Sequence, residues 1–185
     1  MSQPVSPDER ATADAALALR RLTTEYVESE DRLRIAAETS EGQTVVLWVT
    51  QRLMLRLVPA LLNWLQPDKS EQTKQTAQHA FAQEEARARL ARQPAVVVED
   101  LQAQSRVDAV DLTLAATSIQ LRWRGPDLPQ PVAVVMEPLP LRQWLGIVHQ
   151  QFAQAQWPMS VWPAWMSAGA ATTEPRQPPV RTTLH

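Results

Sequence analysis

The segment TVVLWVTQRLMLRLVPALLNWL, residues 44–65, contains a change of hydrophobic period that decides the fold. Residues 44–50 form a continuous apolar run, which is typical of a central strand buried on both faces. From Gln51 onward, leucines recur at helical spacing, at positions 53, 57, 61 and 65. The sequence therefore predicts a strand over 44–50 that leads directly into a helix over 51–66.

The predicted helix 51–66 is apolar on nearly all sides, so we expect it to be deeply buried. Pro59 lies inside it and removes one backbone hydrogen bond, which predicts a kink or a break near Val58. The segment 45–65 is also long enough to cross a bilayer. However, Arg52 and Arg56 would each cost about 2.5–3.5 kcal/mol at its centre. We therefore expect no membrane span.

Two more strands are predicted before the central one. Residues 21–28 are rich in Thr, Tyr and Val, and residues 32–39 alternate, with Leu33 and Ile35 on one face. The intervening turn before residue 44 contains Gly42, which tolerates a positive φ. Residues 20–66 thus form a predicted β-β-β-α unit.

The second half of the chain follows the same pattern. Residues 118–125 alternate, with Ile119, Leu121 and Trp123 facing inward and arginines facing outward. The other predicted elements are an alternating strand over 107–115, an apolar strand over 131–137 and a helix over 141–156 that follows two prolines. Val110, Leu112 and Leu114 would face inward from the first of these strands.

At an offset of 87 residues (132 minus 45), the run 45–49 aligns with 132–136. At the same offset, Leu61 aligns with Val148 and Leu65 with Phe152. The sequence therefore predicts two pseudo-repeated β-β-β-α units, 20–66 and 106–156, although two similar patterns can also agree by chance.

A polar helix is predicted between the two units, over residues 69–92. Its apolar stripe is thin and consists of Ala77, Ala80, Phe81, Ala88 and Ala91. We expect this helix to bridge the two units from outside, because it can pack only lightly.

The fold class is then α+β, in a single domain over residues 16–156. Six antiparallel strands would form two sheets or one split sheet. We expect a flexible N-terminal tail over 1–15, a Trp/Pro-rich segment over 157–166 and a disordered C-terminal tail over 167–185. The N-terminal residues lack the basic and apolar regions of a secretory signal, so the expected localisation is cytoplasmic.

The order of strands, a helical pair, further strands and a terminal helix over residues 20–156 resembles the head domains of the eukaryotic DNA end-joining scaffold and of the centriolar cartwheel proteins. Those heads are dimerising scaffold modules, so the resemblance implies a scaffold rather than an enzyme. The long coiled coil of those proteins is absent from this sequence, which leaves the mode of assembly open.

Motifs for catalysis or cofactor binding are missing from the sequence. The chain has no cysteine, and its four glycines are too dispersed to form a phosphate-binding loop. His79, His149 and His185 do not have the spacing of metal ligands. We therefore predict a non-enzymatic protein without metal or cofactor.

An enzyme with an unfamiliar site is the third hypothesis, and it would centre on Glu25, Glu28 and His149. Glu28 lies with Glu30 and Asp31 in a predicted hairpin turn. We favour the interpretation that these carboxylates form a solvated hairpin tip.

Two arginine clusters support the second hypothesis, which is binding to nucleic acid. They are Arg87, Arg89 and Arg92 at the end of the polar helix, and Arg122 and Arg124 on one strand face. Trp123 alternates with the second cluster and therefore points into the core rather than toward a bound base. Because the net charge is −2, the chain has no general attraction to nucleic acid, and we interpret these arginines as solvated.

The segment WPMSVWPAWM, residues 157–166, carries three of the seven tryptophans. Burial of such side chains contributes roughly 1.5–3 kcal/mol each, so we expect them to be covered. They cover either a groove beside the Ala-rich helix of the same chain or the surface of a partner. The candidates for partner binding are Trp157, Trp162, Trp165 and Met166.

The first hypothesis for the function follows from these patterns. The protein is predicted to be an accessory or scaffold subunit in an assembly. It would bind a protein partner, or a second copy in a homo-oligomer, through an apolar surface and the Trp-rich segment.

Overall fold

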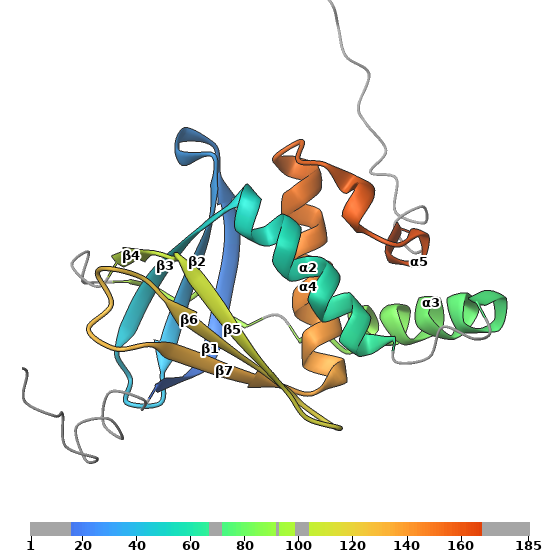
Figure 1. Cartoon of the computed structure of the whole chain (residues 1–185), viewed down its shortest axis with the longest axis horizontal. Coiled ribbons are helices and arrows are strands. Elements are labelled where there is room, and N and C mark those ends of the chain that lie inside the picture. The colour runs from blue at the N-terminus through green and yellow to red at the C-terminus, as the bar shows by residue number, and fades with distance from the viewer. Residues whose placement is uncertain (1–15, 67–71, 92, 99–103, 168–185) are drawn as a thin grey trace, which may run out of the picture.

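The computed structural model describes residues 16–66, 72–91, 93–98 and 104–167. Within these ranges the chain is a mixed α+β protein with one curled seven-stranded sheet and four α-helices. Figure 1 shows the helices gathered on one side of the sheet. The predicted tail 1–15, nearly all of the predicted tail 167–185, the first residues of the predicted helix 69–92, Arg92 and His185 lie outside the described residues.

The strands in chain order are β1 (Leu17–Val27), β2 (Arg32–Thr39), β3 (Thr44–Thr50), β4 (Gln104–Arg106), β5 (Ala109–Leu114), β6 (Ile119–Arg124) and β7 (Val132–Met136). The α-helices are α2 (Gln51–Leu65), α3 (Gln72–Ala88), α4 (Pro138–Gln154) and α5 (Ala164–Ser167). Two short 3₁₀ helices, η1 (Glu28–Glu30) and η2 (Met159–Val161), follow β1 and α4.

The strand order in the sheet is β4-β3-β2-β1-β7-β6-β5. Three antiparallel strands from each half form a meander, and the two meanders join where Leu17 and Ala18 of β1 pair with Val132 and Ala133 of β7 in parallel. β4 adds to β3, also in parallel. The expectation of six antiparallel strands therefore missed β4 and both parallel pairings. β4 was missed because a strand of three residues is too short to show a period.

The segment that contains β4 and β5 brings the two edges of the curled sheet together. The N–H of Val107 donates to the carbonyl oxygen of Trp48 in β3 (2.9 Å), and the N–H of the next residue, Asp108, donates to the carbonyl oxygen of Arg124 in β6 (2.9 Å). At this junction Gly125 lies so close to Arg106 that a Cβ atom there would overlap the Arg106 carbonyl oxygen. The sheet is thus closed by a segment that is bonded on both sides.

The alternating strands bury the predicted face. Leu33 and Ile35 of β2 and Ile119, Leu121 and Trp123 of β6 are all at most 1% exposed. β5 follows its prediction only in part, because Val110 and Leu112 pack against the core whereas Leu114 is exposed. Leu114 is the last residue of an edge strand, where the sheet no longer covers it.

α2 begins and ends within one residue of the predicted helix. The Oγ1 of Thr50 caps its N-terminus by accepting from the N–H of Leu53 (3.3 Å). The helix runs unbroken through Pro59, so the predicted break does not occur. Its buried face is formed by Met54, Leu57, Val58, Leu61, Leu62 and Leu65, while Arg52, Arg56 and Asn63 are exposed.

α2 is therefore amphipathic rather than buried on all sides, which corrects the sequence expectation. The deeper helix is α4, with eight buried residues against six in α2. The aligned pairs Leu61 and Val148, and Leu65 and Phe152, are buried in both helices. This agreement is compatible with a repeat, but a common origin of the two halves stays a prediction.

α3 turns a different face inward from the one predicted. Gln83 and Ala86 are its buried residues, whereas Phe81 is 74% exposed and Ala77, Ala88 and Ala91 are also exposed. The helix lies against α4 and α5. The inward face is set by these neighbours, which the weak Ala pattern of the helix does not reveal. Among the described residues, no helix is long and apolar enough to span a membrane.

Candidate functional site

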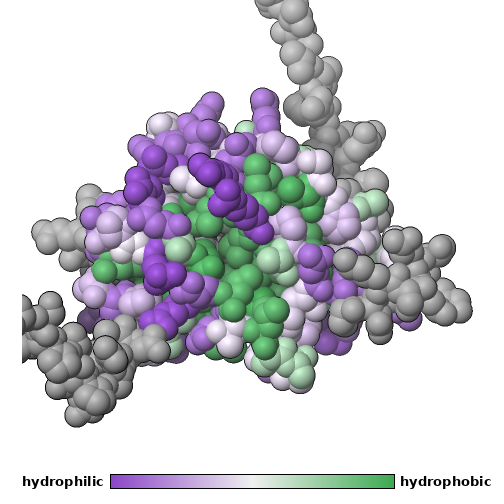
Figure 2. Space-filling view, viewed as in Figure 1, coloured by the Kyte–Doolittle hydropathy of each residue, from purple (hydrophilic) through white to green (hydrophobic). Residues whose placement is uncertain are grey.

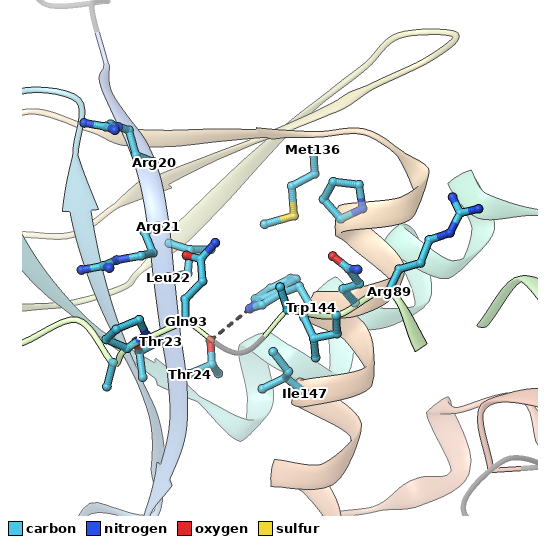
Figure 3. Close-up of a pocket in the computed structure, with 16 residues that line it drawn as sticks. Arg20, Arg21, Leu22, Thr23, Thr24, Arg89, Gln93, Met136, Trp144 and Ile147 are labelled. Atoms are coloured by element: carbon cyan, nitrogen blue, oxygen red, sulfur yellow. Dashed lines mark hydrogen bonds between the residues drawn. The ribbon is translucent and has the colours of Figure 1, made fainter. Parts of the chain in front are cut away.

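The candidate site is a groove of about 570 Å³ between β1, the N-terminal half of α4 and the chain that follows α3. Figure 3 shows β1 on one side and α4 on the other, with Trp144 pointing across from the helix toward the strand. A volume of this size lies within the range of ordinary ligand-binding pockets. We call this feature the β1–α4 groove. It is lined by Arg20, Arg21, Leu22, Thr23, Thr24, Arg89, Leu90, Ala91, Gln93, Pro94, Ala95, Met136, Pro140, Gln143, Trp144 and Ile147.

The floor of the β1–α4 groove is apolar and held in place by the fold. β7 ends at Met136, α4 starts at Pro138, and the first turns of the helix bring Trp144 and Ile147 under the groove. The indole N–H of Trp144 donates to the Oγ1 of Thr24 in β1 (3.0 Å). This hydrogen bond joins the helix to the strand and fixes the floor.

The rim of the groove is cationic. Arg20, Arg21 and Arg89 line it, and none of the lining residues that the structure describes is an Asp or a Glu. Arg21 pairs with Glu38 (3.0 Å) and Arg89 with Glu85 (2.8 Å), both from outside the groove. Arg20 is exposed and forms no ion pair within the described part of the chain. Two of the three arginines are therefore already paired, and Arg20 is the described rim cation left for a ligand.

The Trp-rich segment folds back onto the protein's own helices. The exposed fractions of Trp157, Trp162, Trp165 and Met166 are 4%, 8%, 5% and 0%. Trp157 packs edge-on against Tyr26 and Phe152, and its indole N–H donates to an Oδ1 of Asp31 (3.0 Å). Of the two locations left open by the sequence, the structure therefore shows packing within the chain.

The other two tryptophans of the segment meet histidines. Trp162 packs edge-on against His149 with a ring separation of 5.1 Å, and Trp165 stacks on His79 at 5.5 Å. The carbonyl oxygen of Met166 accepts from a guanidinium N–H of Arg87 (2.6 Å). The segment is thus fixed by apolar, aromatic and charged contacts to α3 and α4.

Beneath this segment lies a buried guanidinium, that of Arg142. One of its nitrogens hydrogen-bonds to the Nδ1 of His79 (2.8 Å), and its carbon lies 5.3 Å from the ring centre of Trp165. No carboxylate among the described residues pairs with Arg142, and burial lowers its pKa. Burial and, secondarily, the charge of Arg142 lower the pKa of His79. His79 accepts a hydrogen bond here, so this arrangement requires its neutral form.

The fold separates Arg87 from Arg89, whereas Arg122 and Arg124 stay together on β6. Arg87 is drawn in toward Met166, and Arg89 lies at the groove rim beside Glu85. Arg124 pairs with Asp111 across β5 and β6 (2.8 Å), and Arg122 is half-buried on the same strand as Arg124. The nucleic-acid hypothesis stays a prediction.

The candidate catalytic residues lie in different environments. Glu25 pairs with Arg34 between β1 and β2 (2.7 Å), Glu28 is exposed in η1, and His149 is buried on α4 beside Trp162. Burial and, secondarily, the charge of Arg87 lower the pKa of His149. Across the described ranges, no group of three or more His, Cys, Asp or Glu residues is arranged to hold a metal ion. Whether the chain is an enzyme stays untested.

Sequence reasoning missed the β1–α4 groove because its walls come from three distant segments, around residues 20, 90 and 140. The predicted strand 21–28 began after Arg20, and no local pattern in the sequence indicated a groove beside it.

The comparisons with known proteins give no assignment. No family model, no curated protein and no solved structure matches this chain. The resemblance to scaffold head domains therefore stays a prediction from element order.

Proposed function

We propose that the protein is a non-enzymatic interaction subunit that binds a segment of a partner protein in the β1–α4 groove. The observation that carries the proposal is the combination of an apolar floor with a rim whose described charged residues are all arginines. Apolar contacts supply affinity in such sites, and a few charged groups at the rim supply orientation.

The polar side chains of the groove support a binding role rather than a catalytic one. The Oγ1 atoms of Thr23 and Thr24 already accept hydrogen bonds, from the N–H of Val96 (2.8 Å) and from Trp144 (3.0 Å). Gln143 donates to the carbonyl oxygen of Ala86 (3.1 Å). Among the described residues that line the groove there is no His, Asp, Glu, Lys or Tyr, so these residues do not supply a general base beside a nucleophile.

The Trp-rich segment has a supporting role in this proposal. Trp157, Trp162 and Trp165 stabilise α3 and α4, and α4 in turn carries the groove floor. A homo-oligomer is a further element of the proposal. Figure 2 shows apolar residues gathered at the centre of one face. Leu53 and Leu55 of α2 are partly buried and keep some apolar surface accessible.

The test is a selection of peptides from a random display library against the folded chain. We expect an enriched family of peptides that bind wild type and lose binding to the variant Ile147→Arg, which places a long charged side chain in the groove. The matched control is Val135→Arg, because Val135 is 62% exposed on β7 and does not line the groove. Equal binding to wild type and Ile147→Arg, or no enrichment at all, would contradict the proposal.

A further inference from the structure

β1 has an open edge beside the groove. It pairs with β2 from Leu19 to Val27, but it pairs with β7 only at Leu17 and Ala18. Beyond Ala18 the strands β1 and β7 no longer pair, and the helix α4 packs against β1 in place of β7. The edge of β1 that faces away from β2 is therefore without a partner strand over most of its length.

The backbone groups that point to this edge can be identified from two contacts. The N–H of Tyr26 donates to the Oε1 of Gln151 on α4 (2.7 Å), so it points away from β2. In β2, the N–H of Thr39 donates to Gln43, on the side of β3. Since strand residues alternate in direction, Leu22 and Thr24 share the orientation of Tyr26 and point away from β2.

Leu22 and Thr24 both line the groove, and Thr24 is buried. No backbone group or side chain of the described residues bonds to their N–H and C=O groups on this edge. Backbone groups this close to the core are nearly always satisfied, by protein or by water. The groove therefore contains a short row of unused strand hydrogen-bonding groups.

We propose that the ligand of the groove is an extended, acidic peptide segment that adds to β1 as a strand at Leu22 and Thr24. The inference rests on the proposed function and names the class of its ligand. Alternate side chains of the bound segment would lie on Met136 and Ile147, and a carboxylate of the segment would pair with Arg20.

Charge and chemistry favour this occupant over a nucleic acid. Carboxylates complement the rim, where the described charged residues are Arg20, Arg21 and Arg89. Among the described residues that line the groove, Trp144 is the one aromatic side chain, and it is 5% exposed and hydrogen-bonded to Thr24. Such a ring offers no open face for stacking on a base.

The experiment uses peptides selected as described above, with the full chain. Replacing the acidic residue of a peptide by its amide should weaken binding about three- to tenfold, and N-methylation of one central amide should weaken it about tenfold. The variant Arg20→Glu should weaken binding of the acidic peptide. It should restore binding of a peptide that carries Lys in place of the acidic residue. Arg52→Glu, an exposed arginine on α2, is the matched control.

Backbone amide exchange gives the second readout. Binding should slow hydrogen exchange at Leu22 and Thr24, while exchange at Thr23, which faces β2, should change little. Peptides that bind in the groove without this protection, or that tolerate N-methylation at every position, would overturn strand addition and leave the proposed function intact.

Two further results would overturn the inference. One is full protection of Leu22 and Thr24 in the free protein, which would indicate that the chain itself occupies the edge. The other is competition by a single-stranded oligonucleotide at physiological salt, which would identify the arginines as a nucleic-acid site. Loss of peptide binding altogether would instead count against the proposed function.

Discussion

At the scale of single residues, the most unusual group is Arg142. A guanidinium in a protein interior is expected to have a carboxylate partner. Here the guanidinium contacts His79 and the face of Trp165 instead. The Nε2 of the neighbouring Gln83 donates to the backbone carbonyl oxygen of Arg142 (3.0 Å). One nitrogen of Arg142 and the Oε1 of Gln83 are buried without a partner among the described groups. The local packing therefore depends on a neutral His79.

This dependence predicts acid sensitivity. The pKa values of His79 and His149 are lowered in the folded protein, so the unfolded chain binds protons more readily. Stability should be fully present above the ordinary histidine pKa of about 6.5 and should fall as the pH drops through that value toward the lowered folded values. His79 faces Arg142 and Trp165, while His149 faces Arg87 and Trp162, and the charges of both arginines disfavour the protonated rings.

Thermal melts between pH 7.5 and pH 5.5 measure this effect. The melting temperature of wild type should decrease across the range, and the decrease should be smaller in the double variant His79→Gln, His149→Gln. Gln retains an oxygen that accepts from Arg142, so the variant should fold. Parallel curves for the two proteins would show that these histidines do not cause the pH dependence.

The inward face of α3 gives a second prediction at the residue scale. Ala86→Leu should destabilise the protein by about 1–3 kcal/mol, because Ala86 is fully buried against α4. Phe81→Ala should change stability by less than about 0.5 kcal/mol, since Phe81 is 74% exposed. Urea unfolding of both variants measures the two effects. The reverse order would support the face predicted from the sequence.

At the scale of elements, the sequence predicted the strands and helices that have strong local periods. The boundaries of β2 and β3 agree with the prediction at both ends, and α2 follows directly after β3 because Thr50 ends the strand and caps the helix. The prediction for the inward face of α3 was wrong because alanine and glutamine are mixed along this helix without a clear apolar stripe. The location of the Trp-rich segment was left open, since apolarity alone does not identify the surface that buries it.

A shortened chain tests the role of that segment. Truncation after Gln156 removes Trp157, Trp162, Trp165 and Met166 and uncovers Phe152 and His149. The free energy of unfolding should fall by about 5 kcal/mol or more, which lowers the melting temperature by at least about 10 °C. Truncation after Ser167 is the control and should leave the melting temperature close to that of wild type. Equal melting of all three chains would show that the segment does not stabilise the domain.

At the scale of the whole molecule, the sheet is defined by contacts that link the beginning, middle and end of the chain. β1 meets β7, β3 meets β4, and Trp64 of α2 donates its indole N–H to the carbonyl oxygen of Ala115 (3.0 Å). The local pattern of six strands was visible in the sequence. Their order, the closure by residues 104–114 and the groove were not, because each depends on pairing between distant segments that no local period encodes.

Gly125 tests the closure. A side chain at this position would overlap the carbonyl oxygen of Arg106 and the Oγ of Ser105, so Gly125→Ala should cost about 1–3 kcal/mol. Gly42→Asn is the matched control, because Gly42 has a φ of 82° and open space around it, and Asn tolerates such angles. Denaturant unfolding compares the two. Similar stability of Gly125→Ala and wild type would mean that residues 104–106 and 125 are less tightly joined than the structure shows.

The late position of β4 in the chain has a consequence for synthesis on the ribosome. β3 is complete at Thr50, but the strand that covers its outer edge begins only at Gln104. At ordinary rates of translation, that edge waits on the order of seconds for its partner. During this interval β3 presents Val46 and Trp48 to neighbouring nascent chains as an unpaired strand. Chains that stall within α3 should therefore aggregate more readily than full-length chains, in which β4 covers this edge.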